Sequence, residues 1–435
     1  MTKRMKITTT ALVVLAHAGT LGAQTTSVPA RDSIALSRIG AIAAALASNP
    51  QLDVAREQTA QARARRTQAV AVPDPTASAS LDDQPGFLQL GQAQSKNVAV
   101  GIQVPFPDKF RLRNRIASAD VQSAELSFVS LRQSLAAATS AAYDTLLVAN
   151  RHHAIVTMSR DLAADFLKKT QARYEGGTAA KLDVIRAQVA LAQAENDLIG
   201  TARDIQTASD GLDRLIGQPI GTPVAPLDSL QVPPPIPDVD LLEQQALRAR
   251  PELASLASQQ AGARASTALA REFWLPDFTL GAQRDYGPAG VGTGALFTAG
   301  IALPVPIFYW QHTKGEIAES QHRERELAAS YRDLRAGIAQ DVRAAYATAT
   351  AALRQAVYIR DALLPSAREA YRVASISYGL GGSSALDVLD ARQNLLDAEL
   401  QYADALAAAN SSRADVERAV AAPLSQFDVQ PRKAP

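Results

Sequence analysis

The stretch YGLGGSSALDVLDARQ, from Tyr378 to Gln393, has a near copy about two hundred residues earlier, YEGGTAAKLDVIRAQ, from Tyr174 to Gln188. In both copies a tyrosine precedes a glycine pair and small residues, and Leu-Asp-Val follows. Glycine and small hydroxyl residues between two apolar periodic segments are typical of a turn that ends one helix and starts the next. The pair therefore predicts two helical hairpins in one chain.

The duplication extends along the chain, because other landmarks recur in the same order at offsets of 199 to 204 residues. The matched segments are 49–52 with 250–253, 101–107 with 300–306, and 217–219 with 421–423. A fixed shift of ordered landmarks predicts a tandem repeat. The expected organisation is a signal peptide at 1–23, a first repeat at 24–218, a proline-rich extended connector at 219–239, a second repeat at 240–423 and a disordered tail at 424–435.

Composition restricts the class of protein. The 435 residues carry a net charge of +1, which gives no basic field for nucleic acid. The N-terminus has Lys3, Arg4 and Lys6 before an apolar stretch and the small-residue pattern Leu21-Gly22-Ala23. This pattern predicts a secretory signal peptide, with a short buried N-terminal helix as the alternative. The chain has no cysteine and no run of eighteen apolar residues after the signal, so any membrane insertion is expected to use strands.

Long helices are predicted in each repeat. Residues 111–175 contain no glycine or proline, and a continuous helix over them would be about 98 Å long. Apolar residues follow both glycine turns at a spacing of seven, which predicts coiled-coil packing. They are Val184, Leu191, Leu198, Ile205 and Leu212 in the first repeat, and Val388, Leu395, Tyr402, Ala409 and Val416 in the second. These helices alone would also suit a soluble rod.

Alternating strands before each long helix argue against a rod. Segments such as NVAVGIQVP, which starts at Asn97, alternate apolar with small or polar residues. The sequence predicts one hairpin at about 76–105 and another at about 277–304, with strands long enough to cross a membrane. Because four strands cannot close a barrel and an open edge in lipid is forbidden, several chains must pool their strands, and a trimer would supply twelve.

Aromatic residues support a membrane position. The windows 73–110 and 273–310 hold 11 of the 22 aromatic residues, at places where an interfacial girdle would lie. Ordinary packing of aromatic residues in strands is the competing explanation. The predicted interface residues are Phe273, Trp274, Phe308, Tyr309 and Trp310.

Three features of the sequence form a recognisable combination: the doubled turn motif, the LPVPIF strand end, and the order of hairpin and long helix in each half. In this combination the sequence resembles the TolC-like outer-membrane efflux proteins. The resemblance implies a mainly α fold with a trimeric twelve-stranded β-barrel in the outer membrane, continued by a helical barrel through the periplasm. It also implies docking to a periplasmic adaptor and to an inner-membrane pump of the RND or ABC type.

The resemblance places the two glycine turns at the periplasmic tip, where the duct closes. The turn glycines are Gly176, Gly177, Gly379, Gly381 and Gly382. Ser383 or Thr178 is expected to cap the returning helix. Asp387 and Asp390 are one helical turn apart, so three chains would form a carboxylate ring that attracts cations. The alternative is a solvated first turn stabilised by the helix dipole.

In the first repeat, Asp183 matches Asp387, and Arg186 stands where the second repeat has Asp390. In related exporters a tyrosine and an arginine tie the gate to an aspartate of the neighbouring hairpin. Tyr378 and Asp183 match this pattern, but Ser383 replaces the arginine, which leaves a salt-bridge lock of that form in question.

No catalytic motif is present, and the adjacent His152 and His153 would be splayed apart by a helix instead of converging on a metal. The expectation is a passive export duct, not an enzyme, with no cofactor. Its second half is similar to ducts of the heavy-metal branch, so metal cations or small toxic compounds are the expected cargo. Protein secretion through an ATP-driven pump, and a periplasmic structural coiled coil outside any channel, are the alternatives.

Overall fold

A computed structural model describes residues 33–82, 95–286, 295–302, 305, 307 and 313–427. The predicted signal peptide at 1–23 lies outside these residues. In the first repeat the chain forms strand β1 (Ile34–Leu36), helices α1 (Arg38–Ser48) and α2 (Pro50–Ala69), strands β2 (Thr76–Asp82) and β3 (Ser95–Val104), and helices α3 (Pro107–Glu175) and α4 (Lys181–Ile216).

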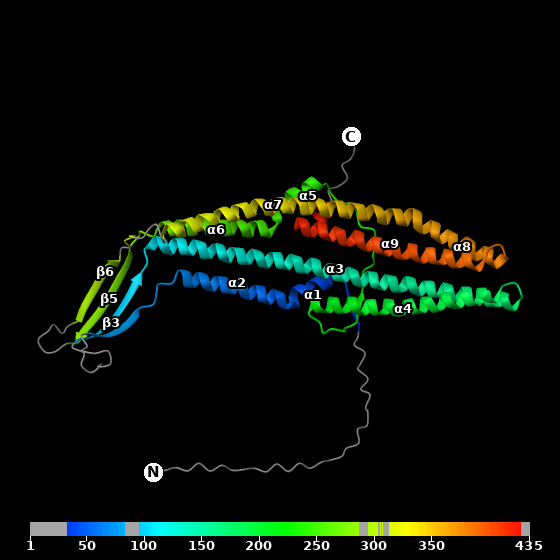
Figure 1. The fold of residues 1–435 in the computed structure, drawn as a ribbon, viewed down its shortest axis with the longest axis horizontal. Coiled ribbons are helices and arrows are strands. Elements are labelled where there is room, and N and C mark those ends of the chain that lie inside the picture. The colour runs from blue at the N-terminus through cyan, green and yellow to red at the C-terminus, as the bar shows by residue number, and fades with distance from the viewer. Residues whose placement is uncertain are drawn as a thin grey trace, which may run out of the picture. The chain divides into compact units, whose positions relative to one another are not determined.

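The second repeat presents the same order of elements (Figure 1). Strand β4 (Val224–Pro226) precedes helices α5 (Val239–Ala249) and α6 (Pro251–Arg271), strands β5 (Asp277–Tyr286) and β6 (Ala295–Ala302), helix α7 (Thr313–Tyr358), the π-helix η2 (Ile359–Leu363), and helices α8 (Leu364–Leu380) and α9 (Ala385–Val420). The recurring X-Pro pairs start corresponding helices, because Pro50 and Pro251 each stand at a helix start, where a missing N–H costs nothing.

The long helix of the first repeat is confirmed as α3, with 69 residues in one piece. In the second repeat the corresponding segment consists of α7, η2 and α8. The π-helix η2 is explained by the proline that follows it. Pro365 has no N–H to donate and its ring would collide with the carbonyl four residues earlier. The bulge avoids this, since the Leu364 N–H bonds to the Ile359 carbonyl five residues back.

The two predicted hairpins join into one sheet with the strand order β2-β3-β5-β6, antiparallel throughout. In its register Ile102 lies opposite Leu280 and Val104 opposite Phe278. One face is mostly apolar and remains exposed, with Val98, Leu280 and Ile301 between 51% and 68% exposed, and Arg284 lies on it opposite Val98. Within the part of the chain that the structure describes, β2 and β6 each pair on one side only.

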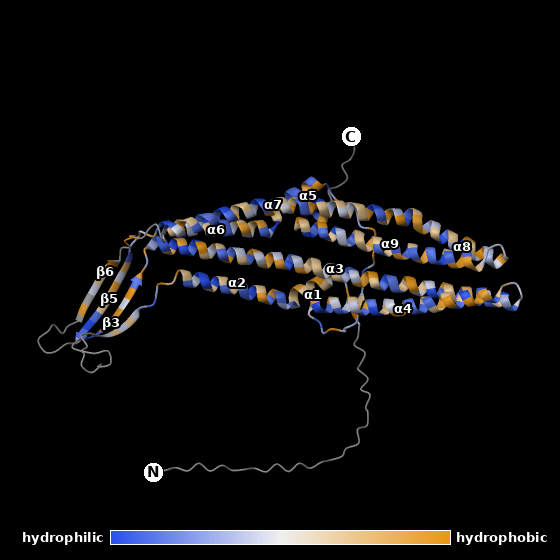
Figure 2. Ribbon diagram, viewed as in Figure 1, coloured by the Kyte–Doolittle hydropathy of each residue, from blue (hydrophilic) through white to orange (hydrophobic). Residues whose placement is uncertain are grey.

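The core follows the helices. Fully buried residues such as Tyr143, Leu146 and Leu212 pack α1, α3 and α4 together, and a similar cluster packs α5, α7 and α9. Apolar and polar residues are interspersed along the helices (Figure 2). Over the described ranges, no helix combines the length and the hydropathy needed to cross a membrane.

The expected tail at 424–435 is wrong for its first four residues. Leu424–Phe427 form the 3-10 helix η3, and Leu424 is fully buried beside Val416 and Val420. The Leu424 N–H also bonds to a Glu417 carboxylate oxygen at 3.0 Å. Burial of the apolar Leu424 side chain against α9 stabilises η3, so this part of the tail is ordered. Residues 428–435 lie outside the described residues.

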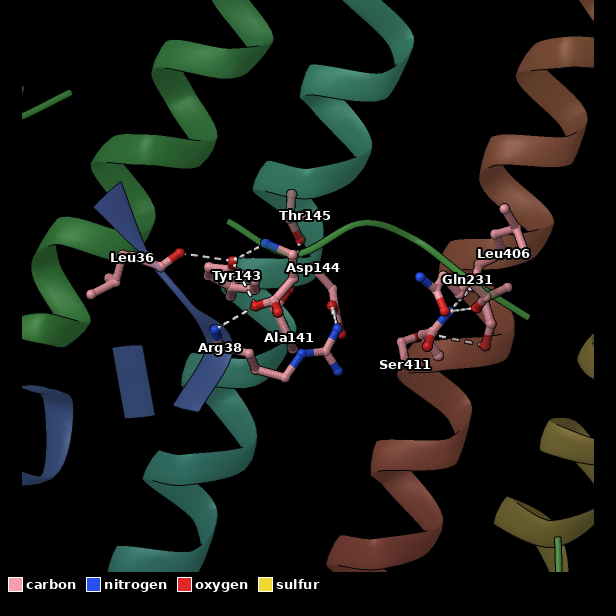
Figure 3. A network of polar contacts seen from close by, with 12 residues as sticks. Leu36, Arg38, Ala141, Tyr143, Asp144, Thr145, Gln231, Leu406 and Ser411 are labelled. Carbon is pink, nitrogen blue, oxygen red and sulfur yellow. Dashed lines mark hydrogen bonds and ion pairs between the residues drawn. The ribbon is translucent and has the colours of Figure 1, made fainter. Parts of the chain in front are cut away.

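The proline-rich connector is extended and bonded to both repeats (Figure 3). On one side β4 pairs in parallel with β1, and the Tyr143 hydroxyl lies 2.9 Å from an Asp228 carboxylate oxygen. On the other side the Asn410 amide donates to the Gln231 carbonyl at 2.9 Å, and Arg413 donates to the Pro234 carbonyl at 3.0 Å. The connector therefore fastens α3 and α9 to one chain segment.

Candidate functional site

The first glycine turn joins α3 to α4. Gly176 is the C-cap of α3, and Gly177 has a φ of +74°, a conformation that favours glycine. Thr178 does not cap α4, contrary to expectation, because Ala180 occupies the N-cap position. Instead the Thr178 N–H and hydroxyl both donate to the Arg173 carbonyl, at 2.8 and 3.1 Å, and satisfy the end of α3.

The second glycine turn is a Schellman motif at the end of α8, in which Gly379 is still helical. Gly381 has a φ of +85°, and the N–H groups of Gly381 and Gly382 bond to the carbonyls of Tyr378 and Ser377. A Cβ on Gly382 would meet the Ser377 hydroxyl at 2.8 Å, so the turn is tight as well as left-handed.

Ser384, not Ser383, caps α9. The Ser384 hydroxyl accepts from the Asp387 N–H at 3.2 Å, and the Asp387 carboxylate accepts from the Ser384 N–H at 2.8 Å, which completes a capping box. The Ser383 hydroxyl turns back to the Ala374 carbonyl at 3.0 Å. The prediction missed by one residue because two adjacent serines can each serve as a cap.

The predicted gate carboxylates differ in their surroundings. Hydrogen bonds from the Ser384 N–H and hydroxyl hold the pKa of Asp387 below its usual range, so this carboxylate stays charged. Asp390 is exposed one turn later and accepts from the Asn394 amide at 3.1 Å. In the first repeat Asp183 lies 3.8 Å from Arg186 on the same helix. Two carboxyl side chains per chain thus lie at the start of α9.

Tyr378 lies inside the protein at 4% exposure, whereas the matching Tyr174 is 43% exposed. Its ring packs on Phe166 at a centroid distance of 5.2 Å. Within one chain, its hydroxyl contacts Thr170 of α3 at 3.3 Å, so the structure does not bring Tyr378 to Asp183. The arginine at this tyrosine comes from the other hairpin, since the guanidinium of Arg173 lies 4.4 Å from the ring centroid.

Sequence reasoning did not single out Arg173. The one available signal was a difference between the repeats, because Arg173 precedes Tyr174 whereas Ser377 precedes Tyr378. The two glycine turns therefore have different chemistry despite their common pattern.

At the other end of α3, aromatic residues surround the start of β5. Trp274 is 58% exposed, and Phe278 stacks on Phe106 with centroids 6.1 Å apart. Lys109 binds Asp277 at 2.8 Å and fastens the first turn of α3 to the sheet. Phe273 is partly buried in the turn before β5. The predicted interface residues Phe308, Tyr309 and Trp310 lie outside the described residues.

The histidine pair is splayed as expected. His152 faces Asp404 of α9 at 2.9 Å, whereas His153 faces the Thr201 hydroxyl of α4 at 2.9 Å. Among the residues that the structure describes, no group of three or more histidine or carboxylate side chains is arranged to hold a metal ion.

Comparison with known proteins agrees with this architecture. The model of the outer membrane efflux protein family matches residues 41–218 and 242–422. The cobalt-zinc-cadmium resistance protein CzcC of Cupriavidus metallidurans is 23% identical over 380 residues, which are 87% of this chain and 88% of CzcC. The pyoverdine export outer membrane protein OpmQ of Pseudomonas aeruginosa is 25% identical over 311 residues, 70% of this chain and 65% of OpmQ.

Solved structures share the fold. The outer-membrane channel OprN superposes with a TM-score of 0.75 at 20% identity, over 89% of this chain and 90% of OprN. The outer membrane protein VceC from Vibrio cholerae gives a TM-score of 0.74 at 19% identity, over 89% and 96% of the two chains. CusC gives 0.73 at 18% identity, over 88% and 91%.

The chain belongs to the outer membrane efflux protein family, because the two family matches cover most of both repeats. The predicted family resemblance is confirmed, and with it the location in the outer membrane of a Gram-negative cell, extending into the periplasm. The matched relatives are export and resistance proteins and not enzymes.

Proposed function

We propose that the protein is the passive outer-membrane duct of a tripartite efflux system. Three copies form a closed twelve-stranded barrel, and α3, α4, α7, α8 and α9 of each copy form the wall of a periplasmic tube. A periplasmic adaptor and an inner-membrane RND or ABC pump supply the cargo and the energy. The observation that carries the proposal is the four-stranded sheet with its exposed apolar face and its two outer strands β2 and β6.

The sheet supports this assembly for a physical reason. An unpaired strand edge in hydrocarbon leaves backbone N–H and carbonyl groups without partners, which costs several kcal/mol per group, on the order found for buried unpaired amides. Pairing β6 of one copy with β2 of the next removes every edge once a ring closes. A periplasmic coiled coil outside any channel would have no use for such a sheet, so we favour the duct.

The cargo is proposed to be a metal cation or a small toxic compound. The similarity to CzcC, a cobalt-zinc-cadmium resistance protein, covers most of both chains and supports the metal branch. The similarity to OpmQ, a pyoverdine export protein, supports the second candidate, a compound other than a metal cation. Protein secretion is the weaker candidate, since neither name points to it.

We assign Asp387 and Asp390 to a carboxylate ring at the periplasmic entrance. Both side chains are exposed at the start of α9, and the capping box fixes the direction of the first. Three copies would bring six carboxylates around one axis, which favours cations over anions.

The test is single-channel recording in planar bilayers with the mature wild type and the Asp387→Asn, Asp390→Asn double variant. We expect small cation-selective currents from the wild type and reduced cation preference from the variant. Ser384→Ala is the matched control, because it removes the cap but keeps both charges. Equal selectivity in all three proteins would contradict the ring, and folded, membrane-inserted wild type without channels would contradict the duct.

A further inference from the structure

The two hairpin turns of one chain are joined at their ends by a single arginine. Arg173 lies in the last turn of α3 and its guanidinium covers the ring of Tyr378, in the last turns of α8. One terminal nitrogen donates to the Tyr378 carbonyl, and the other donates to the Thr178 carbonyl at 3.2 Å. The side chain thus contacts the turn of its own hairpin and the end of the other.

Arginine suits this place better than lysine. The contact uses a flat cation on an aromatic face together with two donors that point to different carbonyls, which only the guanidinium fork provides. The cation also lies near the C-terminal ends of α3 and α8, in contact with the Tyr378 carbonyl of α8 and the Thr178 carbonyl of the turn, where helix dipoles are negative. One side chain therefore places a favourable positive charge near the ends of two helices.

The ring that Arg173 covers belongs to a small core at the hairpin tips, which we call the tip core. It consists of Phe166, Ala187, Tyr378, Ala385 and Val388, from α3, α4, α8 and α9. All five are 4% exposed or less, so apolar burial packs the four helices together here, and the Tyr378 hydroxyl also contacts Thr170 of α3 at 3.3 Å. Arg173 closes this core on the side of the turns.

Beyond the Tyr378–Thr170 contact, a further polar contact between the hairpins lies deeper in the bundle. Arg392 of α9, which is 7% exposed, donates to the Ser159 hydroxyl of α3 at 3.0 Å. Ser159 precedes Arg173 by 14 residues, or about 21 Å of helix. Release of Arg173 would leave the tip core and the Tyr378–Thr170 contact to hold the hairpins together over this length, with the Arg392–Ser159 contact below them.

We propose that Arg173 is a positioning residue that holds the tip of the second hairpin against the first within each chain, and so sets how readily the entrance of the duct opens. The inference rests on the proposed duct function. It assigns the restraint to an arginine of the first repeat, in a chain where Ser383 stands at the arginine position expected in the second.

A series of variants removes the contacts of Arg173 and Tyr378 one group at a time. Arg173→Ala removes all of them, and Arg173→Lys keeps the charge but loses the flat face and the fork. Tyr378→Phe keeps the ring and loses only the hydroxyl contact with Thr170. Lys169→Ala is the matched control, because it removes a cation one turn earlier on α3 whose partner Asp165 is on the same helix.

The tip geometry is measured directly by spin-label distances. The chain has no cysteine, so labels placed at Glu175→Cys and Leu380→Cys are the only ones, and labelled chains are diluted with unlabelled chains to isolate distances within one copy. Both positions are exposed in the structure. We expect a narrow distance distribution in wild type, Lys169→Ala and Tyr378→Phe, and a broader, longer one in Arg173→Ala, with Arg173→Lys between them.

Bilayer conductance provides the functional readout. We expect Arg173→Ala to raise the open probability or conductance at least several-fold over wild type and Lys169→Ala. An unchanged distance distribution in Arg173→Ala would overturn the proposal, and so would a broadened distribution with unchanged conductance. If the wild type forms no channel, the duct itself fails, while the spin-label distances still report on whether Arg173 holds the tip.

Discussion

Asp144 on α3 should make the stability of the protein depend on pH. Its side chain is 4% exposed and pairs with the Arg38 guanidinium (Figure 3). Burial raises the pKa of this carboxyl to about 6 although Arg38 opposes the change, and the nearby Asp228 carboxylate adds to it.

The direction of the effect follows from linkage. The folded-state pKa of about 6 exceeds the ordinary value of 3.8, so the folded protein binds the proton more tightly than the unfolded chain does. The stabilisation by protonated Asp144 is therefore complete below pH 4 and is lost as pH rises through 6. At 1.36 kcal/mol for each pKa unit, the loss is about 3 kcal/mol.

Asp144→Asn should remove this dependence. We expect the free energy of unfolding of the variant, measured relative to wild type by urea titration and circular dichroism in detergent, to rise by about 3 kcal/mol between pH 4 and pH 7. The difference between the two proteins cancels the titration of other groups. Asp361→Asn is the control, because Asp361 is exposed and Arg360 lowers its pKa. A flat difference for Asp144→Asn, or one of opposite sign, would refute the reasoning.

Two further changes test the packing and the cap. Leu424→Ala should lower the free energy of unfolding by about 2 to 5 kcal/mol, since the side chain is fully buried, and the exposed Leu380→Ala should cost little in the same urea titration. Ser384→Ala should cost about 1 kcal/mol and speed hydrogen exchange of the first amides of α9, whereas Ser383→Ala should leave those amides unchanged; equal exchange in both variants would contradict the assignment of the cap.

Local patterns in the sequence predicted the elements well. Alternation marked the four long strands, and the absence of glycine and proline from 111–175 marked α3, because both signals depend on neighbours in the chain. The pairing of β3 with β5 could not be predicted in this way, since Val104 and Phe278 meet across 174 residues. The π-helix before Pro365 was also missed, because a proline in the sequence indicates that the regular helical hydrogen bonding is interrupted but does not indicate which local structure replaces it.

The local structure of the two glycine turns was predicted in outline. The glycine turns and Asp387 follow from the doubled motif, but the role of Tyr378 depends on which helix lies against it. Its partners Phe166, Thr170 and Arg173 precede it by more than two hundred residues, and no local pattern connects them. The burial of Leu424 was hidden as well, because its cluster includes distant residues of α5 and α7 besides those of α9, and the short segment alone has no apolar period.

The connector fixes the ratio in which the cell makes the two repeats. Since Asp228 is bonded to the first repeat and Gln231 to the second, side chains and backbone already hold the halves together on both sides of the proline-rich segment. The covalent link through the connector adds a fixed one-to-one ratio of the two repeats. One act of translation delivers one copy of each half, so two surfaces that differ at Arg173 and Ser377 always arrive in equal number, and in the proposed ring of three chains they would alternate.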